Sequence, residues 1–107
     1  MITVILIDDE RPALRELEYI LKNMQNVRVL GSFVNPQQGL DAVAEHKPDA
    51  VFLDINMPQL SGMDVAAIIA EKSPDTRIVF ITAYDQYAVK AFELNALDYL
   101  LKPISRE

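Results

Sequence analysis

The sequence predicts an α/β protein in which helices cover both faces of a parallel, five-stranded β-sheet. Short apolar runs rich in β-branched residues alternate along the chain with segments of helical periodicity. The runs at residues 4–7 and 78–81 contain no alternating polar residues, which is typical of strands buried on both faces. Right-handed crossovers between successive parallel strands then place helices on both sides of the sheet.

Five strands are expected, at residues 4–7, 27–33, 50–53, 78–81 and 97–101. Each is a short run of apolar and β-branched side chains, as buried strands require. The run at residues 27–33 alternates more between apolar and polar residues than the others. We therefore expect it to form an edge of the sheet.

Helices are expected in the intervals between the strands. The first carries an apolar stripe of residues spaced three and four positions apart, namely Leu14, Leu17, Leu21 and Met24. Asn35 followed by Pro36 is typical of a helix start, because Asn caps free amide groups and Pro fits the first turn. A third helix is expected after Gly62, and a fourth helix capped by Asp85.

Chemically capable side chains follow the carboxyl ends of four expected strands. They are Asp8, Asp9 and Glu10, then Asp54, then Thr82, and finally Lys102. Ligands of open parallel sheets bind outside these strand ends, so the side chains are expected to meet at one edge. Carboxylates without His or Cys favour a hard divalent ion, and a few such ligands suit Mg²⁺. Asp54 is a competent nucleophile toward phosphorus, and a cation, an ammonium group and a hydroxyl would neutralise the phosphoryl oxygens.

Length, charge and composition narrow the function further. The chain has 107 residues, enough for one domain, and no cysteine for disulfides or thiolate chemistry. Its net charge of -6 argues against binding of a nucleic-acid backbone by this domain itself. The sequence shows neither a signal peptide nor an apolar run long enough to cross a bilayer. We expect a cytoplasmic protein without a membrane partner.

Four segments resemble the signature blocks of response-regulator receiver domains of bacterial two-component systems. They read IDDE at residues 7–10, LDINMPQLSG at 53–62, ITA at 81–83 and DYLLKP at 98–103. The resemblance spans almost the whole chain. It implies a flavodoxin-like sheet of strand order 2-1-3-4-5, one receiver domain over residues 1–107, a Mg²⁺ cofactor and a histidine kinase as partner. Residues 84–93 and 95–103 are similar to regulators with a LytTR-type output domain, which implies transcriptional control and DNA contact only through a domain absent from this chain.

The resemblance also implies a role for each matching residue. Asp54 is the expected phosphoacceptor, and the expected metal site comprises Asp9, Asp8 acting through water, Asp54 and the backbone carbonyl of Asn56. Thr82 and Lys102 are expected to contact the phosphoryl group, and Tyr99 is expected to switch together with Thr82. Ala83 and Tyr84 are expected to govern access to the pocket. The Lys102–Pro103 peptide bond is expected to be cis.

Plainer and competing explanations exist for these residues. Acids before a helix suit its N-terminus, and Thr82 is a common strand residue, so each alone is weak evidence. An alternative function is a Mg²⁺-dependent aspartyl-phosphate phosphatase or phosphotransferase, but Asn56 replaces its usual second acid and no cap insertion is visible. A pseudo-receiver would lack the nucleophile, the acid pair or the lysine, and all are present. We therefore expect a phosphorylation-operated switch and not an enzyme.

The end of the chain has its own consequence. The receiver fold closes with a fifth helix after Pro103, whereas this sequence ends at Glu107. The resemblance therefore implies a C-terminally truncated domain whose fifth helix is largely missing. An uncovered apolar face of the sheet would favour self-association, most simply as a homodimer.

Overall fold

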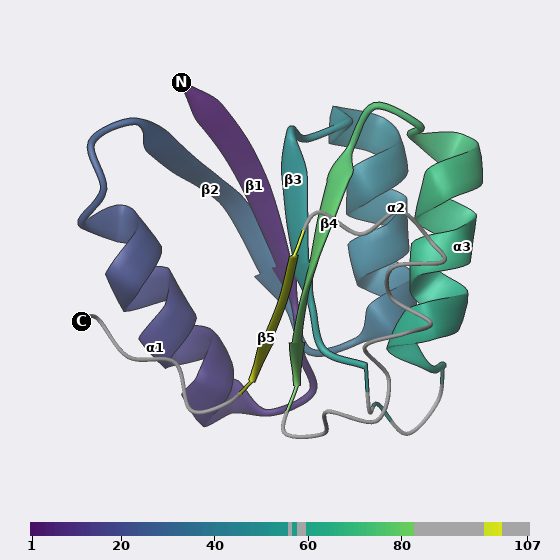
Figure 1. Cartoon of the computed structure of the whole chain (residues 1–107), viewed down its shortest axis with the longest axis horizontal. Coiled ribbons are helices and arrows are strands. Elements are labelled where there is room, and N and C mark those ends of the chain that lie inside the picture. Colours follow the sequence, from purple (N-terminus) through teal and green to yellow (C-terminus); the bar gives the residue numbers. More distant parts are fainter. Residues whose placement is uncertain (56, 58–59, 83–97, 102–107) are drawn as a thin grey trace.

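The computed structural model describes residues 1–55, 57, 60–82 and 98–101, the last four and Thr82 as backbone. Its elements are β1 (Ile2–Ile7), α1 (Arg11–Lys22), β2 (Val27–Phe33), α2 (Pro36–His46), β3 (Ala50–Leu53), α3 (Gly62–Lys72), β4 (Arg77–Thr82) and β5 (Asp98–Leu101). All pairings are parallel, and the sheet has the order β2-β1-β3-β4-β5 (Figure 1). The predicted strand order and the edge position of β2 are confirmed.

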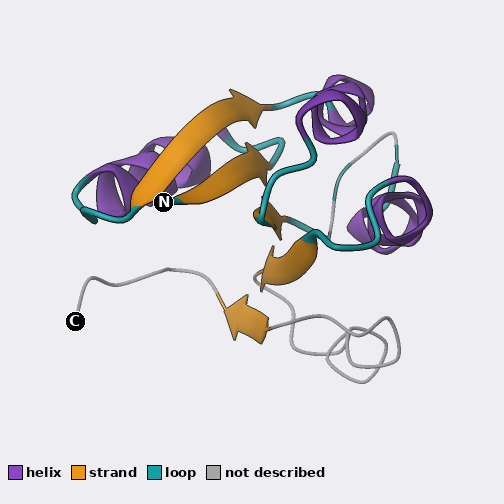
Figure 2. Ribbon diagram, turned by 90° about the horizontal axis from the view of Figure 1, so that it is seen from above, coloured by secondary structure: helices purple, strands orange, loops and turns teal. Residues whose placement is uncertain are grey.

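Helices lie on both faces of the sheet, with α1 on one side and α2 and α3 on the other (Figure 2). Residues of β1 alternate between these layers, since Val4 and Leu6 join the core under α1 whereas Ile5 and Ile7 join the core under α2 and α3. All four side chains are at most 2% exposed. The absence of polar alternation in this strand thus reflects burial on both faces.

The helix starts follow the predicted signals with one difference. The Asn35 side chain accepts hydrogen bonds from two backbone amides of the first turn of α2, with Pro36 as the first helical residue. The cap of α3 is Ser61, whose hydroxyl accepts from the amide of Met63, and Gly62 is already inside the helix. The fourth helix expected after Asp85 lies outside the described residues, as do residues 102–107.

The apolar stripe of α1 is shorter than expected. Leu14, Leu17 and Leu21 are buried, but Met24 is 50% exposed. The helix ends at Lys22, so Met24 no longer follows the helical spacing that would turn it toward the sheet. Its assignment to the buried stripe was wrong.

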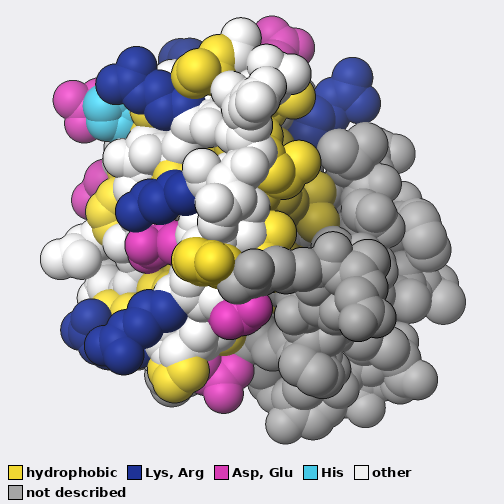
Figure 3. Space-filling view, turned by 90° about the vertical axis from the view of Figure 1, so that its left-hand side faces the viewer, with side chains coloured by type: hydrophobic (Ala, Val, Ile, Leu, Met, Phe, Trp, Pro, Cys, Tyr) yellow, Lys and Arg dark blue, Asp and Glu magenta, His cyan; other side chains and the backbone are white. Residues whose placement is uncertain are grey.

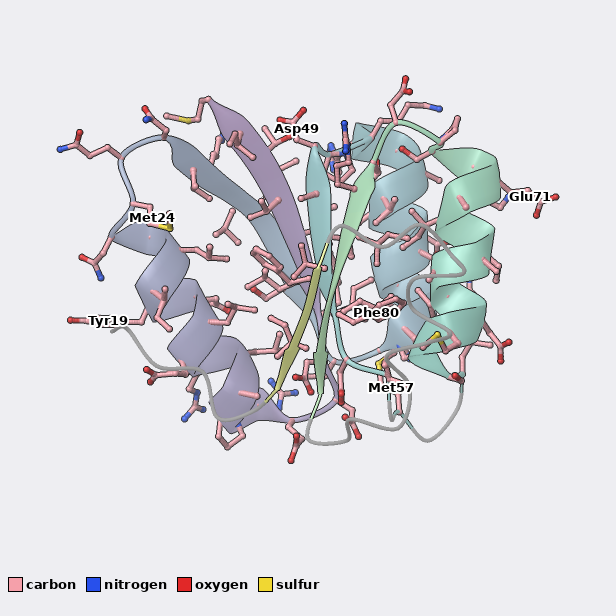
Figure 4. All side chains as sticks on the ribbon, viewed as in Figure 1. Tyr19, Met24, Asp49, Met57, Glu71 and Phe80 are labelled. Atoms are coloured by element: carbon pink, nitrogen blue, oxygen red, sulfur yellow. The ribbon has the colours of Figure 1, made fainter. Side chains whose placement is uncertain are left out.

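Hydrogen bonds tie the starts of the strands together, at the edge opposite the predicted site. The Asp49 carboxylate accepts from the Thr3 amide at 2.8 Å and from the Thr3 hydroxyl at 3.1 Å, and the Asp49 carbonyl accepts from the Arg77 amide at 2.9 Å. Figure 4 shows Asp49 at this end of the sheet and Met57 at the other. The backbone amide of Thr3, followed by its hydroxyl, lowers the pKa of Asp49 below its ordinary value.

Two buried hydroxyls strengthen the same edge. The Thr76 hydroxyl donates to the carbonyl of Pro48 at 2.7 Å and lies 2.6 Å from the Ser73 hydroxyl. Both side chains are less than 10% exposed, at 8% and 3%, so these bonds satisfy groups that water does not reach. They join the segment before β3 to the turn before β4.

The Asp49 contacts predict a pH-dependent stability. A carboxyl group whose pKa is lower in the folded chain stabilises the fold above its ordinary value of 3.8, and that contribution is lost as the pH falls through the lowered pKa. We expect Asp49→Asn to melt at a lower temperature than the parent at neutral pH, and the difference to shrink as the pH drops below 3.8. Thermal melts across this range measure it.

Asp75→Asn is the matched control, because this exposed side chain has no hydrogen-bond partner in the described part of the chain. It should melt close to the parent at every pH. A constant gap between parent and Asp49→Asn at all pH values would show that the charge of Asp49 has no part in its effect.

Candidate functional site

Parallel pairing of β1 and β3 brings two buried carboxylates together. Ile7 and Leu53 are register partners at the strand ends, and each strand continues into an aspartate, Asp8 and Asp54. The Asp54 amide donates to the carbonyl of Ile7 at 2.9 Å, and the Asp8 amide donates to that of Phe33 at 3.0 Å. Asp8 is 6% and Asp54 4% exposed. Strand pairing thus holds both acids at the carboxyl edge of the sheet.

A third acid, Glu10, completes a cluster. One carboxylate oxygen from each of Asp8, Glu10 and Asp54 lies within 4.8 Å of the others, although Glu10 is exposed. The Glu10 amide donates to an oxygen of Asp8 at 2.9 Å, which turns the chain into α1. Like charges at this separation repel one another, and burial strengthens the repulsion. A cation among these oxygens would relieve it.

Asp9 stands apart from this cluster. Its side chain is half-buried, and its buried Oδ1 atom has no hydrogen-bond partner among the described residues. A buried acceptor without a donor is unfavourable, by roughly 1–3 kcal/mol for typical groups, so such an atom calls for an explanation. All the side-chain ligand atoms that these described acids offer are oxygens, which suits Mg²⁺ or another hard divalent ion. These residues fit such an ion.

The loop after Asp54 is anchored in the core. Ile55 is 2% and Met57 8% exposed, and both belong to the hydrophobic cluster under α2 and α3. The carbonyl of Ile55 accepts from the amides of Met57 at 3.2 Å and Gly62 at 2.7 Å. The loop is therefore folded back onto the start of α3 directly beside Asp54.

The remaining predicted residues are described in part or not at all. The backbones of β4 and β5 end side by side, since Thr82 pairs with Leu101, and Phe80 pairs with Tyr99. This brings the ends of both strands to one edge of the parallel sheet. The side chains of Thr82 and Tyr99 lie outside the described residues. So do the whole of Asn56, Ala83, Tyr84, Lys102 and Pro103.

Glu10 was expected at this edge but was given no specific role there, and Gly62 was not expected at the site. Glu10 belongs to the acidic triplet after β1, but strand-end spacing gives no reason to choose it over Asp9. Gly62 closes a recognisable sequence block, yet nothing in the sequence indicates its contact with Asp54. Both depend on how the chain turns after a strand, which short-range patterns do not specify.

The face that carries α1 and β2 bears both charge signs. In Figure 3, the Lys and Arg side chains of the described residues are interspersed with Asp and Glu. A hollow of about 330 Å³ lies between α1 and the end of β2, and Arg11 and Arg15 are among the residues that line it. Among the described helices, none combines the length and apolar character that a bilayer crossing demands.

Comparison with known proteins identifies the family. Residues 4–107 match the family model of the response regulator receiver domain. The chain is 48% identical over 109 residues to an uncharacterized response regulatory protein of Vibrio cholerae, covering 100% of this chain and 45% of that protein. It is 42% identical over 107 residues to the sensory transduction protein LytT of Bacillus anthracis, with coverages of 100% and 44%.

A solved structure agrees with this result. The response regulatory domain of protein mrkE from Klebsiella pneumoniae matches with a TM-score of 0.89 and 40% identity, over 97% of this chain and 85% of that one. The chain spans less than half the length of both curated relatives, which are longer proteins. The fold, the buried acids at the carboxyl edge of the sheet and the match over nearly all residues lead to one conclusion: the chain belongs to the family of response regulator receiver domains.

Proposed function

We propose that Asp54 accepts a phosphoryl group from a histidine kinase and that the resulting aspartyl phosphate controls a transcriptional output. The observation that carries this proposal is the position of Asp54, a buried carboxylate at the end of β3 whose oxygen lies within 4.8 Å of oxygens from Asp8 and Glu10. An isolated buried acid would be a liability to the fold. A cluster of buried acids at the edge where ligands of parallel sheets bind indicates a functional site.

The chemistry required of the chain is nucleophilic attack. An ionised Asp54 oxygen forms the new O–P bond while the P–N bond to the kinase imidazole breaks, and the imidazole nitrogen leaves with the electron pair and takes up a proton. The pairing of β3 with β1 keeps Asp54 in place, and burial limits the access of water to the product. We assign Lys102 and Thr82 to the phosphoryl oxygens, where an ammonium group and a hydroxyl offset the added negative charge.

The acidic residues would also hold a divalent ion. We propose that Asp9 and Asp54, with the Asn56 carbonyl, bind Mg²⁺, and that Asp8 acts through water. The buried Oδ1 atom of Asp9, which has no hydrogen-bond partner in the described part of the chain, supports its part in this set. When bound, such an ion supplies charge neutralisation for the transferred phosphoryl group.

Signal output is proposed to follow from the change of charge at Asp54. Thr82 would move toward the new anion, Tyr99 would turn into the space behind it, and the surface beside β5 would change.

Ala83 and Tyr84 are proposed to set access to the pocket, and Lys102–Pro103 to adopt a cis bond. Self-association and an output domain that binds DNA belong to this proposal for the whole protein. LytT, one of the relatives, is named as a sensory transduction protein.

The phosphoacceptor assignment predicts that Asp54→Asn takes up no phosphoryl group from acetyl phosphate or a histidine kinase in the presence of Mg²⁺. The amide keeps the size of the side chain but removes the nucleophilic oxygen. Intact-protein mass spectrometry and phosphate-affinity gels measure the uptake. Asp49→Asn is the matched control, because it makes the same change at the other end of β3.

Stoichiometric labelling of Asp54→Asn would contradict the assignment. The same samples separate a switch from an enzyme. A long-lived phosphoprotein supports the switch, whereas continuous release of inorganic phosphate at many turnovers per second supports the alternative phosphatase.

The environment of Asp9 predicts two opposite effects of Asp9→Ala. Without metal, in EDTA, removal of the unsatisfied buried oxygen should raise the melting temperature by a few degrees, since about 1 kcal/mol shifts it by about 4–8 °C in a domain of this size. With Mg²⁺, titration calorimetry should show affinity weakened at least tenfold, by the loss of a ligand. A drop in metal-free stability would instead make Asp9 a structural residue.

Glu10→Gln is the comparison variant. Because Glu10 is exposed and its charge is hydrated, we expect its Mg²⁺ affinity to stay within about threefold of the parent. A larger loss of Mg²⁺ affinity for Glu10→Gln than for Asp9→Ala would indicate that the ion binds to the cluster of Asp8, Glu10 and Asp54 instead.

A further inference from the structure

Gly62 lies in direct contact with the backbone that carries Asp54. It is the first residue of α3, and it is buried. A Cβ atom at this position would lie 2.6 Å from the Cα of Ile55 and 2.9 Å from the carbonyl carbon of Asp54, and closer still to the Asp54 carbonyl oxygen. Real Cβ atoms essentially never approach other heavy atoms within 3.0 Å. Any side chain at residue 62 would therefore force a movement.

The requirement for glycine here is one of space and not of backbone conformation. No glycine in the described ranges has a positive φ, so an alanine could adopt the dihedral angles of Gly62. The atoms that block it belong to the main chain. A main-chain atom, unlike the end of a side chain, cannot rotate out of the way.

The surroundings decide which part would move. The helix α3 is held by Val65, Ala66 and Ile69, all 0% exposed in a close-packed core. The strand β3 is held up to Leu53 by its pairing with β1 and β4. The peptide that joins Asp54 to Ile55 lies between these two elements and contacts Gly62 directly. It belongs to neither element, so we assign the displacement to it even though the Ile55 side chain is buried.

We propose that Gly62 is a positioning residue for phosphoryl transfer. Because it lacks a side chain, the Asp54–Ile55 peptide lies against the start of α3, and this contact sets where the Asp54 carboxylate stands relative to Asp8 and Glu10. Gly62 acts through Asp54 and touches no reacting atom itself. The inference rests on the proposed role of Asp54 as phosphoacceptor.

The test is Gly62→Ala, first studied without metal. We expect a folded chain in which the amide ¹H and ¹⁵N shifts of Asp54 and Ile55 move while those of β2 do not. Mg²⁺ affinity should weaken about tenfold. The rate constant for uptake from acetyl phosphate at saturating Mg²⁺ should fall about 100-fold, the loss that a misplacement of roughly 1 Å produces in a reacting group.

Two control variants distinguish a displacement of Asp54 from a loss of folding stability. Ser61→Ala removes the hydroxyl that caps α3 at 3.1 Å from the Met63 amide, but adds no atom beside Asp54, so it should lower the melting temperature and leave the uptake rate unchanged. Gly31→Ala would bring a Cβ to 2.8 Å from the ring of Phe33, a half-buried side chain that can turn aside, and should also leave the rate unchanged.

A Gly62→Ala chain with parental Asp54 shifts and a parental uptake rate overturns the proposal, and so does an equal loss of rate in Ser61→Ala. If Gly62→Ala does not fold in buffer, all variants are measured in sucrose, which favours the compact state. A chain that stays unfolded there overturns a positioning role, because Gly62 would then serve the whole fold. A parent chain that takes up no phosphoryl group overturns the proposed function. The metal-free spectra test the contact between Gly62 and Asp54 independently of that function.

Discussion

Burial of the sheet on both faces is the constraint on which the site depends. A strand covered on both sides has no room for a polar side chain until it ends, and β1 and β3 end at the same level because they are parallel register partners. Asp8 and Asp54 are the first residues beyond that limit. The same packing that stabilises the fold therefore gathers its carboxylates at one edge. Burial there reduces the screening of their repulsion by water.

Much of this arrangement was predictable from the sequence. The strands and the start of α2 at Asn35 and Pro36 depend on periodicity and capping, which are local properties of the sequence. The strand order was expected from the resemblance to receiver domains, because periodicity does not specify which strands are neighbours. The end of α1 was less predictable, because Met24 continues the apolar spacing beyond the point where the helix stops. Spacing alone does not show where a helix loses its contact with the sheet.

The site was predictable at the level of strand ends but not of individual oxygens. Position after a strand correctly brought Asp8 and Asp54 to one edge. Which of Asp9 and Glu10 turns toward them depends on the dihedral angles of a tight turn, where the Glu10 amide bonds to Asp8. Likewise, the contact of Gly62 with Asp54 arises from the approach of two elements joined by a loop. Such contacts follow from tertiary packing, and no short sequence pattern encodes them.

The strand starts and the strand ends have different properties. Thr3, Asp49 and Thr76 form hydrogen bonds at one edge, whereas the other edge carries clustered acids and a buried oxygen of Asp9 that no described residue hydrogen-bonds. The clustered acids are thus separated in space from the bonds that secure the fold. This separation lets the two edges evolve independently. Substitutions that strengthen the hydrogen bonds at the strand starts add stability, and that added stability lets the residues at the strand ends change without loss of the folded state.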